Sequence, residues 1–349
     1  MKYYGVAYDV GLRYVPDTLS VEPFDPALVA HDMRVIADEL HANTVRIEGE
    51  KLDRLETASR LAHAAGLKVF FNPWLIDRDL DEIDAYLGEA AVIAEKLRTE
   101  GVDIVFVTGC EITFFAKGIF PGESFMDRGA WLGSHFSFGG EHAGPDEELV
   151  QKSAELNASL RRFVGTVRKS YHGRVTYSAG SWEFVDWEPF DIVGIDHYRR
   201  GESEEEYVGA LDRYRRAGKE LIVMEFGCCT YEGAAAKGDG GFVILQGTNA
   251  DGTVAWENGV APTRSEREQA EYIDRQLELL RGKVDGAFVF IFSFPTYPVG
   301  EGPNDLDMAS FAIVKTYPAH DARSRQMPPW TPKESFHHVA ESLARIAVP

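Results

Sequence analysis

Eight short runs of apolar and β-branched residues recur along the chain, and longer segments with helical spacing of apolar residues separate them. This alternation predicts a parallel sheet whose strands are joined by helices. Eight strand–helix units close a barrel, and no part of the chain remains for a second domain. We therefore predict an α/β fold, a single (β/α)8 TIM barrel over residues 1–349. The predicted strands are residues 3–9, 43–48, 68–74, 103–109, 174–180, 191–198, 220–226 and 287–294.

Three connections that follow predicted strands are long. They are residues 112–146 after the fourth strand, 227–262 after the seventh and 295–331 after the eighth. Loops of this size without strong periodicity are usually functional or disordered. In barrels the functional face is the one where the strands end. We therefore expect these three connections to wall a cleft above the strand ends.

Two glutamates stand at such strand ends. Glu111 follows the fourth predicted strand in DIVFVTGCEI, and Glu225 lies at the end of the seventh in ELIVMEFG. An acid at the exit of a buried strand does not serve packing, because burying a charge is costly. A retaining glycosidase needs two carboxyl groups about 5 Å apart, one to protonate the leaving oxygen and one to attack the anomeric carbon. The two glutamates are candidates for such a pair.

Short segments around these residues resemble clan A of the glycoside hydrolases, a group of retaining (β/α)8 barrels. VMEFG is similar to the strand that carries the nucleophile of the clan, ANTVRI to its second strand and IDHY to its sixth. TGCEI is similar to a divergent branch around families 5 and 113, which includes β-mannanases. The resemblance spans the whole barrel. It implies a glycosidase of carbohydrate metabolism and favours β-linked substrates.

Carried over residue by residue, the resemblance implies that Glu111 is the acid/base and Glu225 the nucleophile. It also implies that Arg46 supports the nucleophile and that Tyr198 donates a hydrogen bond to it. A guanidinium and a phenol stabilise an ionised carboxylate, whereas a less polar surround keeps an acid protonated. We therefore predict a retaining glycoside hydrolase that cleaves an oligosaccharide or a small glycoside by double displacement.

Two positions depart from the pattern of the clan. Cys110 stands where most members have an asparagine that binds the sugar 2-hydroxyl. The eighth strand offers Phe292 or Phe294 where a tryptophan is common. These differences leave the sugar and the linkage open. The further candidates for substrate binding are Asn72, Trp74, Trp182, Asp196, His197 and Phe294.

Other interpretations of the same residues stay open. Arg46 can pair with Glu48 or Glu50 instead, and Tyr198, His197 and the tryptophans can serve packing alone. The site can also act as a transglycosylase, in which a second sugar takes the place of water. A third possibility is a barrel that binds a carbohydrate or a protein without catalysis.

A metal-dependent hydrolase would need ligands such as Asp196, His197, His135 and His142. No HxH or HExxH spacing supports such a site, and we predict that the chain binds no metal ion. Neither a P-loop nor a GxGxxG motif after a strand is present. We therefore predict no cofactor.

The balance of charge bears on partners and location. The chain has 36 Lys and Arg against 56 Asp and Glu, a net charge of −20. Such a surface repels phosphate backbones and anionic membranes, so neither nucleic acid nor a membrane is an expected partner. The sequence starts without the pattern of a signal peptide. Its three cysteines, Cys110, Cys228 and Cys229, have no CxxC spacing. We expect a cytoplasmic protein, and its oligomeric state is left open.

Overall fold

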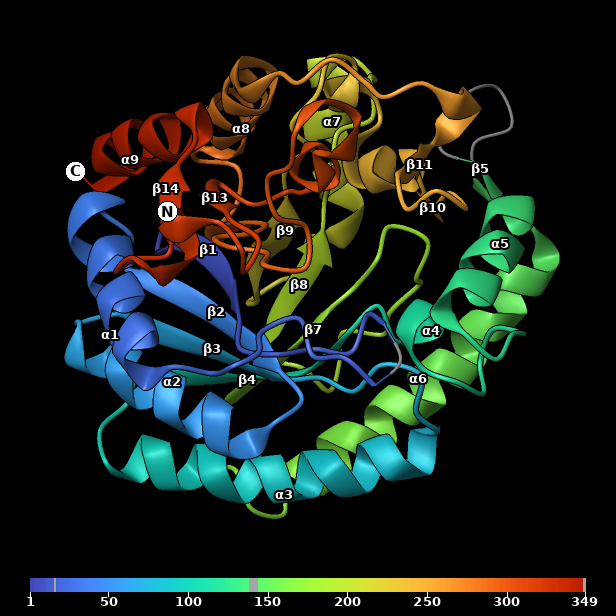
Figure 1. Cartoon of the computed structure of the whole chain (residues 1–349). Helices are drawn as coiled ribbons and strands as arrows, with labels where there is room; N and C mark the ends of the chain where they lie inside the picture. The colour runs from blue at the N-terminus through green and yellow to red at the C-terminus, as the bar shows by residue number, and fades with distance from the viewer. Residues whose placement is uncertain (16, 138–143, 348–349) are drawn as a thin grey trace.

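The eight predicted strands all form, and they make one parallel sheet. The computed structural model of the chain describes residues 1–15, 17–137 and 144–347. The strands follow the order β7-β4-β3-β2-β1-β12-β9-β8, and a bridge between Ala179 and Ile195 joins the two ends of the sheet into a barrel. Helices surround this barrel, as predicted (Figure 1). The barrel strands are β1 Tyr3–Asp9, β2 Thr44–Gly49, β3 Lys68–Pro73, β4 Ile104–Cys110, β7 Arg174–Ser178, β8 Ile192–Asp196, β9 Glu220–Phe226 and β12 Gly286–Val289.

Helices connect most successive strands on the outside of the barrel. The connection from β7 to β8 is an exception to the predicted strand–helix alternation, because its described residues 179–191 form only turns and extended chain. The outer helices are α1 Pro26–Arg34, which continues as the π-helix Val35–Glu39, α2 Leu52–Ala64, α3 Leu80–Thr99, α6 Glu147–Val167, α7 Glu204–Gly209, which continues as the 3-10 helix Ala210–Tyr214, α8 Glu266–Leu280 and α9 Glu334–Ala347.

The three long connections carry short elements of their own. After β4 come α4 Ile112–Phe115, α5 Phe125–His135, β5 Phe136–Ser137 and β6 Gly144–Pro145. The connection after β9 contains β10 Leu245–Thr248 and β11 Val254–Trp256, and the one after β12 contains β13 Val314–Thr316 and β14 Trp330–Pro332. His142, one of the metal-ligand candidates, lies outside the described residues.

Local signals set where the helices begin. Asp25 caps α1, because its carboxylate accepts a hydrogen bond from the Ala27 amide, and Pro26 occupies the first turn, where its missing N–H costs nothing. Ser265 caps α8 in the same way, through the Glu268 amide. No helix of the described residues is long and apolar enough to cross a membrane.

The interior of the barrel changes character along the strands. Its amino-terminal and middle part is apolar and contains Tyr3, Phe70, Val105, Val107, Ile192, Ile222, Met224 and Phe288. Toward the carboxyl ends the buried residues become polar, and they include Arg46, Glu48, Asn72, Cys110, Ser178, Asp196 and Glu225. Buried polar groups are costly unless they are paired. This end of the barrel is therefore the candidate functional site.

Candidate functional site

Glu225 reaches the interior through an irregularity in β9. Met224 belongs to the apolar interior cluster, so strict alternation would turn Glu225 outward. The pairing of β9 shifts register at this point against both β8 and β12. A bulge of this kind re-aims a side chain and is common beside active sites. As a result, the Glu225 carboxylate meets groups from β2, β4 and the end of β8.

Two donors hold the Glu225 carboxylate. Arg46 Nη1 lies 2.5 Å from Glu225 Oε1, and the Tyr198 hydroxyl donates to Oε2 at 2.9 Å. All three side chains are buried, with Arg46 completely enclosed. Charge-assisted hydrogen bonds of this kind are about twice as strong as neutral ones. The predicted neighbours of Glu225 therefore do meet it in the structure.

Arg46 has further partners in the wall of the barrel. Its Nε donates to Asn72 Oδ1 at 2.9 Å, and its Nη2 lies 3.2 Å from Glu48 Oε2. Glu48 is fully enclosed, and this burial raises its pKa to about 8. Burial thus favours the protonated form of Glu48. The pairing of Arg46 with Glu48, an open alternative from the sequence, exists alongside its pairing with Glu225.

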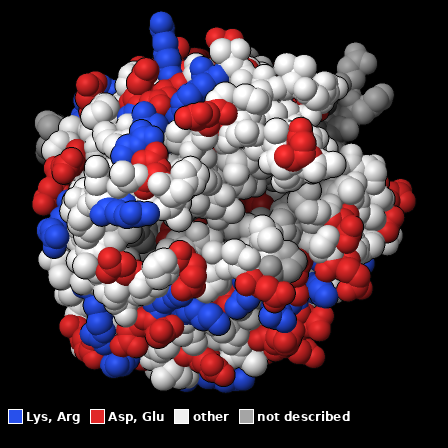
Figure 2. Space-filling model, viewed as in Figure 1, with Lys and Arg blue, Asp and Glu red and all other residues white. Residues whose placement is uncertain are grey.

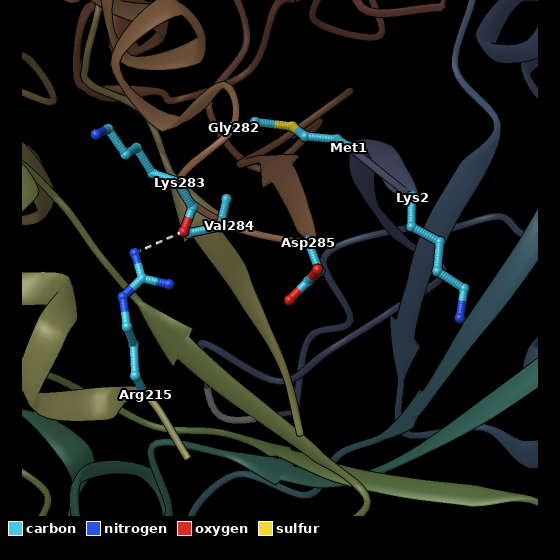
Figure 3. A pocket seen from close by; sticks show the side chains of 7 residues that line it. All are labelled: Met1, Lys2, Arg215, Gly282, Lys283, Val284 and Asp285. Carbon is cyan, nitrogen blue, oxygen red and sulfur yellow. Dashed lines mark hydrogen bonds between the residues drawn. The ribbon is translucent and has the colours of Figure 1, made fainter. Parts of the chain in front are cut away.

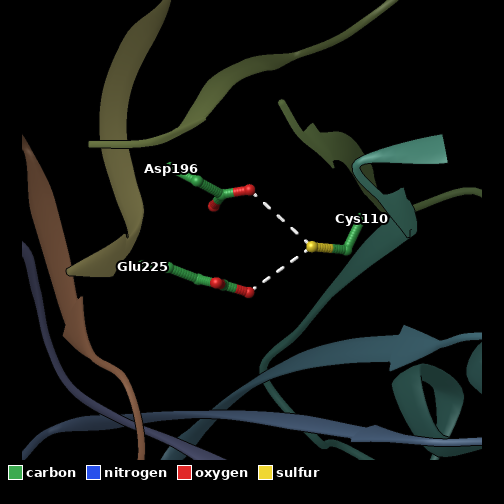
Figure 4. A group of neighbouring side chains, drawn as sticks. All are labelled: Cys110, Asp196 and Glu225. Carbon is green, nitrogen blue, oxygen red and sulfur yellow. Dashed lines mark hydrogen bonds between the residues drawn. The ribbon is translucent and has the colours of Figure 1, made fainter. Parts of the chain in front are cut away.

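Cys110 lies between two carboxylates (Figure 4). Its thiol is 3.4 Å from Glu225 Oε1 and 3.7 Å from Asp196 Oδ2. Asp196 in turn accepts a hydrogen bond from Ser178 Oγ at 2.6 Å. Burial and the two carboxylates raise the pKa of Cys110 well above its ordinary value, so the thiol is protonated and acts as a donor. The residue at the position of the usual asparagine is therefore also a hydrogen-bond donor beside Glu225.

Cys110, Asp196 and Glu225 are also the set of described residues whose side chains approach closely enough to hold a metal ion, within 4.8 Å of one another. The Arg46 guanidinium lies 2.5 Å from the Glu225 carboxylate of this set and repels a cation there. Of the predicted histidine ligands, His135 stacks on Trp131 and His142 lies outside the described residues.

Glu111 stands beside this group at the end of β4. Its backbone has a φ of 42°, in the left-handed region that few residues other than glycine adopt. The side chain is partly exposed, and no described side chain is hydrogen-bonded to its carboxyl. Burial of the carboxyl, together with the charges of Asp196 and Glu225, raises the pKa of Glu111 well above its ordinary range. These surroundings therefore favour the protonated form of Glu111.

A row of aromatic rings comes from the segments that follow β1, β3, β4 and β12. Phe115 and Trp74 have centroids 4.7 Å apart, Trp74 and Tyr14 6.2 Å, Tyr14 and Phe294 5.5 Å, and Phe294 and Tyr297 5.1 Å. We call these five residues the aromatic wall. Except for Trp74, each is only partly buried. Partly exposed aromatic faces are suited to stacking on the apolar faces of sugar rings.

Two predicted binding residues point elsewhere. The His197 ring stacks on Tyr207 of α7 at 4.2 Å, and its Nε2 lies 2.9 Å from the Tyr207 carbonyl oxygen. Burial lowers the pKa of His197 to about 4, so this histidine is neutral and serves packing. Trp182 is also buried, and its indole N–H donates to Thr113 Oγ1 at 3.0 Å. Neither residue meets Glu225.

The surface is hollowed above the strand ends. In Figure 2 an acidic side chain is visible at the bottom of a hollow near the centre of the view. A separate pocket of about 340 Å³ lies at the opposite end of the barrel, where Met1 and Lys2 precede β1 and residues 282–285 precede β12 (Figure 3). A second pocket, of about 390 Å³, lies outside the barrel against the connection from β7 to β8. Since barrels place chemistry at the carboxyl ends of strands, neither pocket is the candidate site.

Some residues of the site were missed from the sequence. Tyr14 joins the aromatic wall from the loop after β1, and a single tyrosine in a loop gives no signal of its own. Ser178 contacts Asp196 from the end of β7, where alternation along the predicted strand would have placed it inside. The segment IDHY also follows the alternation of side chains along an extended chain. Asp196 and Tyr198 share one face of an extended segment, and His197 faces the other way.

Comparison with known proteins supports the fold. No family model and no curated protein sequence matches the chain. Among solved structures it is similar to the GH113 β-mannanase of Alicyclobacillus acidocaldarius in complex with ManMIm, with a TM-score of 0.60 and 17% identity over 99% of each chain. It is also similar to β-glucosidase 1317, with a TM-score of 0.55 and 12% identity over 100% of this chain and 99% of the other.

A third similar structure is a calcium-binding mutant of Bacteroides uniformis β-glucuronidase 2, with a TM-score of 0.56 and 12% identity over 97% of this chain and 34% of the other. At such identities the likeness concerns the fold. It confirms the predicted (β/α)8 barrel and agrees with the resemblance of the sequence to the family 113 branch.

Proposed function

We propose that the chain is a retaining glycoside hydrolase. Glu225 attacks the anomeric carbon while Glu111 protonates the departing oxygen, and Glu111 then deprotonates the water that releases the sugar. The observation that carries this proposal is that the two glutamates differ in their hydrogen-bond donors. Glu225 accepts hydrogen bonds from Arg46 and Tyr198, which stabilise its negative charge, whereas the Glu111 carboxyl has no such donor and a raised pKa.

The proposed substrate is a β-linked oligosaccharide or a small β-glycoside. The aromatic wall supports a carbohydrate ligand, because its rings follow the carboxyl ends of β1, β3, β4 and β12, the end of the barrel that carries the two glutamates. The β linkage is supported by the names of similar structures, which are a β-mannanase, a β-glucosidase and a β-glucuronidase.

The test is hydrolysis of a panel of 4-nitrophenyl α- and β-glycosides. Proton NMR of the first product formed from a cleaved substrate gives its anomeric configuration before mutarotation. We expect cleavage of β-glycosides with a β-anomer as first product. An α-anomer from a β-glycoside would mean inversion and would contradict the proposed mechanism. If no glycoside is cleaved while sugars still bind, the barrel is a binding protein instead.

The acid role of Glu111 predicts the alkaline side of the pH profile. Glu111 acts while protonated, so activity is present below its pKa and falls as pH rises through it. Because that pKa is raised, this fall occurs at a higher pH than an ordinary glutamate would give. The unchanged protein should show this fall in kcat/KM on a phenyl glycoside, whose leaving group needs a proton, and should lose most of it on a 2,4-dinitrophenyl glycoside, whose leaving group needs none. The same alkaline limb on both substrates would assign the titration to another group.

Tyr198→Phe tests the second donor on Glu225. The change removes the hydroxyl that donates to Glu225 Oε2 at 2.9 Å and keeps the ring in its packing against Phe311. A hydrogen bond to a charged group contributes about 1.5–3 kcal/mol, so we expect kcat to fall by about 10- to 100-fold. Steady-state kinetics on the best aryl glycoside measures this. Tyr171→Phe, which changes a buried tyrosine whose hydroxyl donates to the Ile104 carbonyl at the start of β4, serves as the control and should stay within about threefold.

A further inference from the structure

The backbone at Glu111 is held in an unusual conformation. Its φ of 42° and ψ of 50° place a non-glycine residue in the left-handed region, directly between β4 and the short helix α4. Such conformations persist only where surrounding groups fix them, and they occur at functional sites. The Glu111 amide donates to the Ser178 carbonyl at 2.9 Å, and its own carbonyl accepts from the amides of the turn that follows. What fixes this turn is therefore what sets the direction of the Glu111 side chain.

A buried carboxylate behind the site fixes the turn. Glu183 Oε1 accepts from the amide of Thr113 at 3.1 Å and from its hydroxyl at 2.6 Å. The Tyr177 hydroxyl donates to Glu183 Oε2 at 2.8 Å and accepts from the Ile112 amide at 2.7 Å. Glu183 and Tyr177 thus hold the two amides that follow Glu111.

The other polar groups around Glu183 are hydrogen-bonded as well. Glu183 also accepts from the Gly180 amide at 3.1 Å, and Thr113 Oγ1 accepts from the Trp182 indole at 3.0 Å. Glu183 and Tyr177 are both buried. Burial raises the pKa of Glu183 to about 7, while the donors from Thr113, Tyr177 and Gly180 favour its ionised form, which only accepts hydrogen bonds and can satisfy them all. A glutamine in its place would turn an N–H₂ group toward a donor and leave a buried polar group unsatisfied.

We propose that Glu183 is a positioning residue for the acid/base Glu111. Together with Tyr177 it locks the amides of Ile112 and Thr113 and so holds the Glu111 carboxyl where a departing oxygen can receive its proton. Glu183 itself touches neither substrate nor the reacting atoms. The inference rests on the proposed function, because only an acid that transfers a proton gives the direction of Glu111 an effect on rate.

Two substrates with different leaving groups distinguish a misplaced acid from a loss of folded protein. A phenyl glycoside releases a basic phenolate and needs a proton from Glu111, whereas a 2,4-dinitrophenyl glycoside releases a weak base that departs without one. The ratio kcat/KM reports the steps up to bond cleavage. A misplaced acid therefore slows the first substrate and spares the second, whereas a loss of folded protein slows both equally.

The experiment compares Glu183→Gln and Tyr177→Phe with the unchanged protein on both substrates. General acid catalysis contributes about 10²- to 10⁴-fold, so partial misplacement should lower kcat/KM on the phenyl glycoside by about 10- to 100-fold. With the dinitrophenyl glycoside it should stay within about threefold. Tyr177→Phe keeps the ring and its packing, so it decides the matter if Glu183→Gln does not fold.

Two control variants match these changes elsewhere in the fold. In Tyr171→Phe the lost hydroxyl donates to the Ile104 carbonyl at the start of β4, at 2.7 Å. In Asp32→Asn the buried carboxylate accepts from the Tyr8 hydroxyl at 2.7 Å and the Trp330 indole at 2.9 Å. Both should change the two substrates by the same factor.

An equal loss on both substrates in Glu183→Gln and Tyr177→Phe, or no loss on either, would overturn the positioning role while leaving the proposed function intact. Failure of the unchanged protein to cleave any glycoside would overturn the proposed function itself, and this inference with it.

Discussion

Replacement of Glu225 by glutamine is expected to lower kcat/KM by about 10⁴- to 10⁶-fold, as is typical when a covalent nucleophile is lost. Glutamine fills the same space but carries no charge and cannot form a stable glycosyl ester. Arg46 and Tyr198, which donate to the carboxylate, remain in place. Steady-state kinetics on an activated aryl glycoside, with circular dichroism to confirm folding, measures the effect.

Glu220→Gln is the matched control for this change. Glu220 lies on the same strand as Glu225 but at its amino end, where it pairs with Lys2 and Arg174 at 2.6 Å each. Exposed pairs of this kind contribute little, so activity should stay within about twofold. If Glu225→Gln kept a tenth or more of the activity, Glu225 could not be the nucleophile.

Replacement of Arg46 by methionine is expected to destabilise the protein as well as inactivate it. The guanidinium is fully enclosed and pairs with Glu225 at 2.5 Å. Removing one partner of a buried pair leaves an uncompensated charge and costs about 3–5 kcal/mol of the free energy of unfolding. The Glu225 carboxylate also loses the guanidinium that donates to it, so activity should be lost if Glu225 is the proposed nucleophile. Urea denaturation measures the first effect and steady-state kinetics the second.

Arg174→Met is the control for Arg46. Arg174 also pairs with a glutamate of β9, Glu220, at the opposite end of the barrel and in a partly exposed position. Its loss should cost less than about 1 kcal/mol. Equal destabilisation by the two changes would mean that the buried pair of Arg46 contributes no more to the free energy of unfolding than the partly exposed pair of Arg174.

The barrel itself was predictable because strand and helix patterns alternate along the chain. The site was partly predictable, because Glu111, Arg46 and Tyr198 lie near strand ends and parallel strands bring their carboxyl ends to one edge. The inward turn of Glu225 was not, since it depends on a bulge that places two consecutive side chains, Met224 and Glu225, on the same side. A bulge leaves no mark in a regular alternation of residues.

Other features depend on contacts between distant segments. The Cys110 thiol meets Glu225 and Asp196 only because three strands converge. The absence of a helix in residues 179–191 brings Glu183 against the turn after β4. No local pattern in the sequence carries this information, because the partners lie about 70 or more residues apart.

Azide rescue of two variants tests the assignment of the two glutamates most directly. With a 2,4-dinitrophenyl β-glycoside, Glu225→Gly leaves space for azide to attack the face from which Glu225 would have reacted, and an α-glycosyl azide should form. In Glu111→Gly the glycosyl-enzyme still forms at Glu225, and azide then displaces it to give a β-glycosyl azide. Opposite anomers from the two variants are the predicted result. The same anomer from both, or no azide product from either while the unchanged protein is active, would contradict the account.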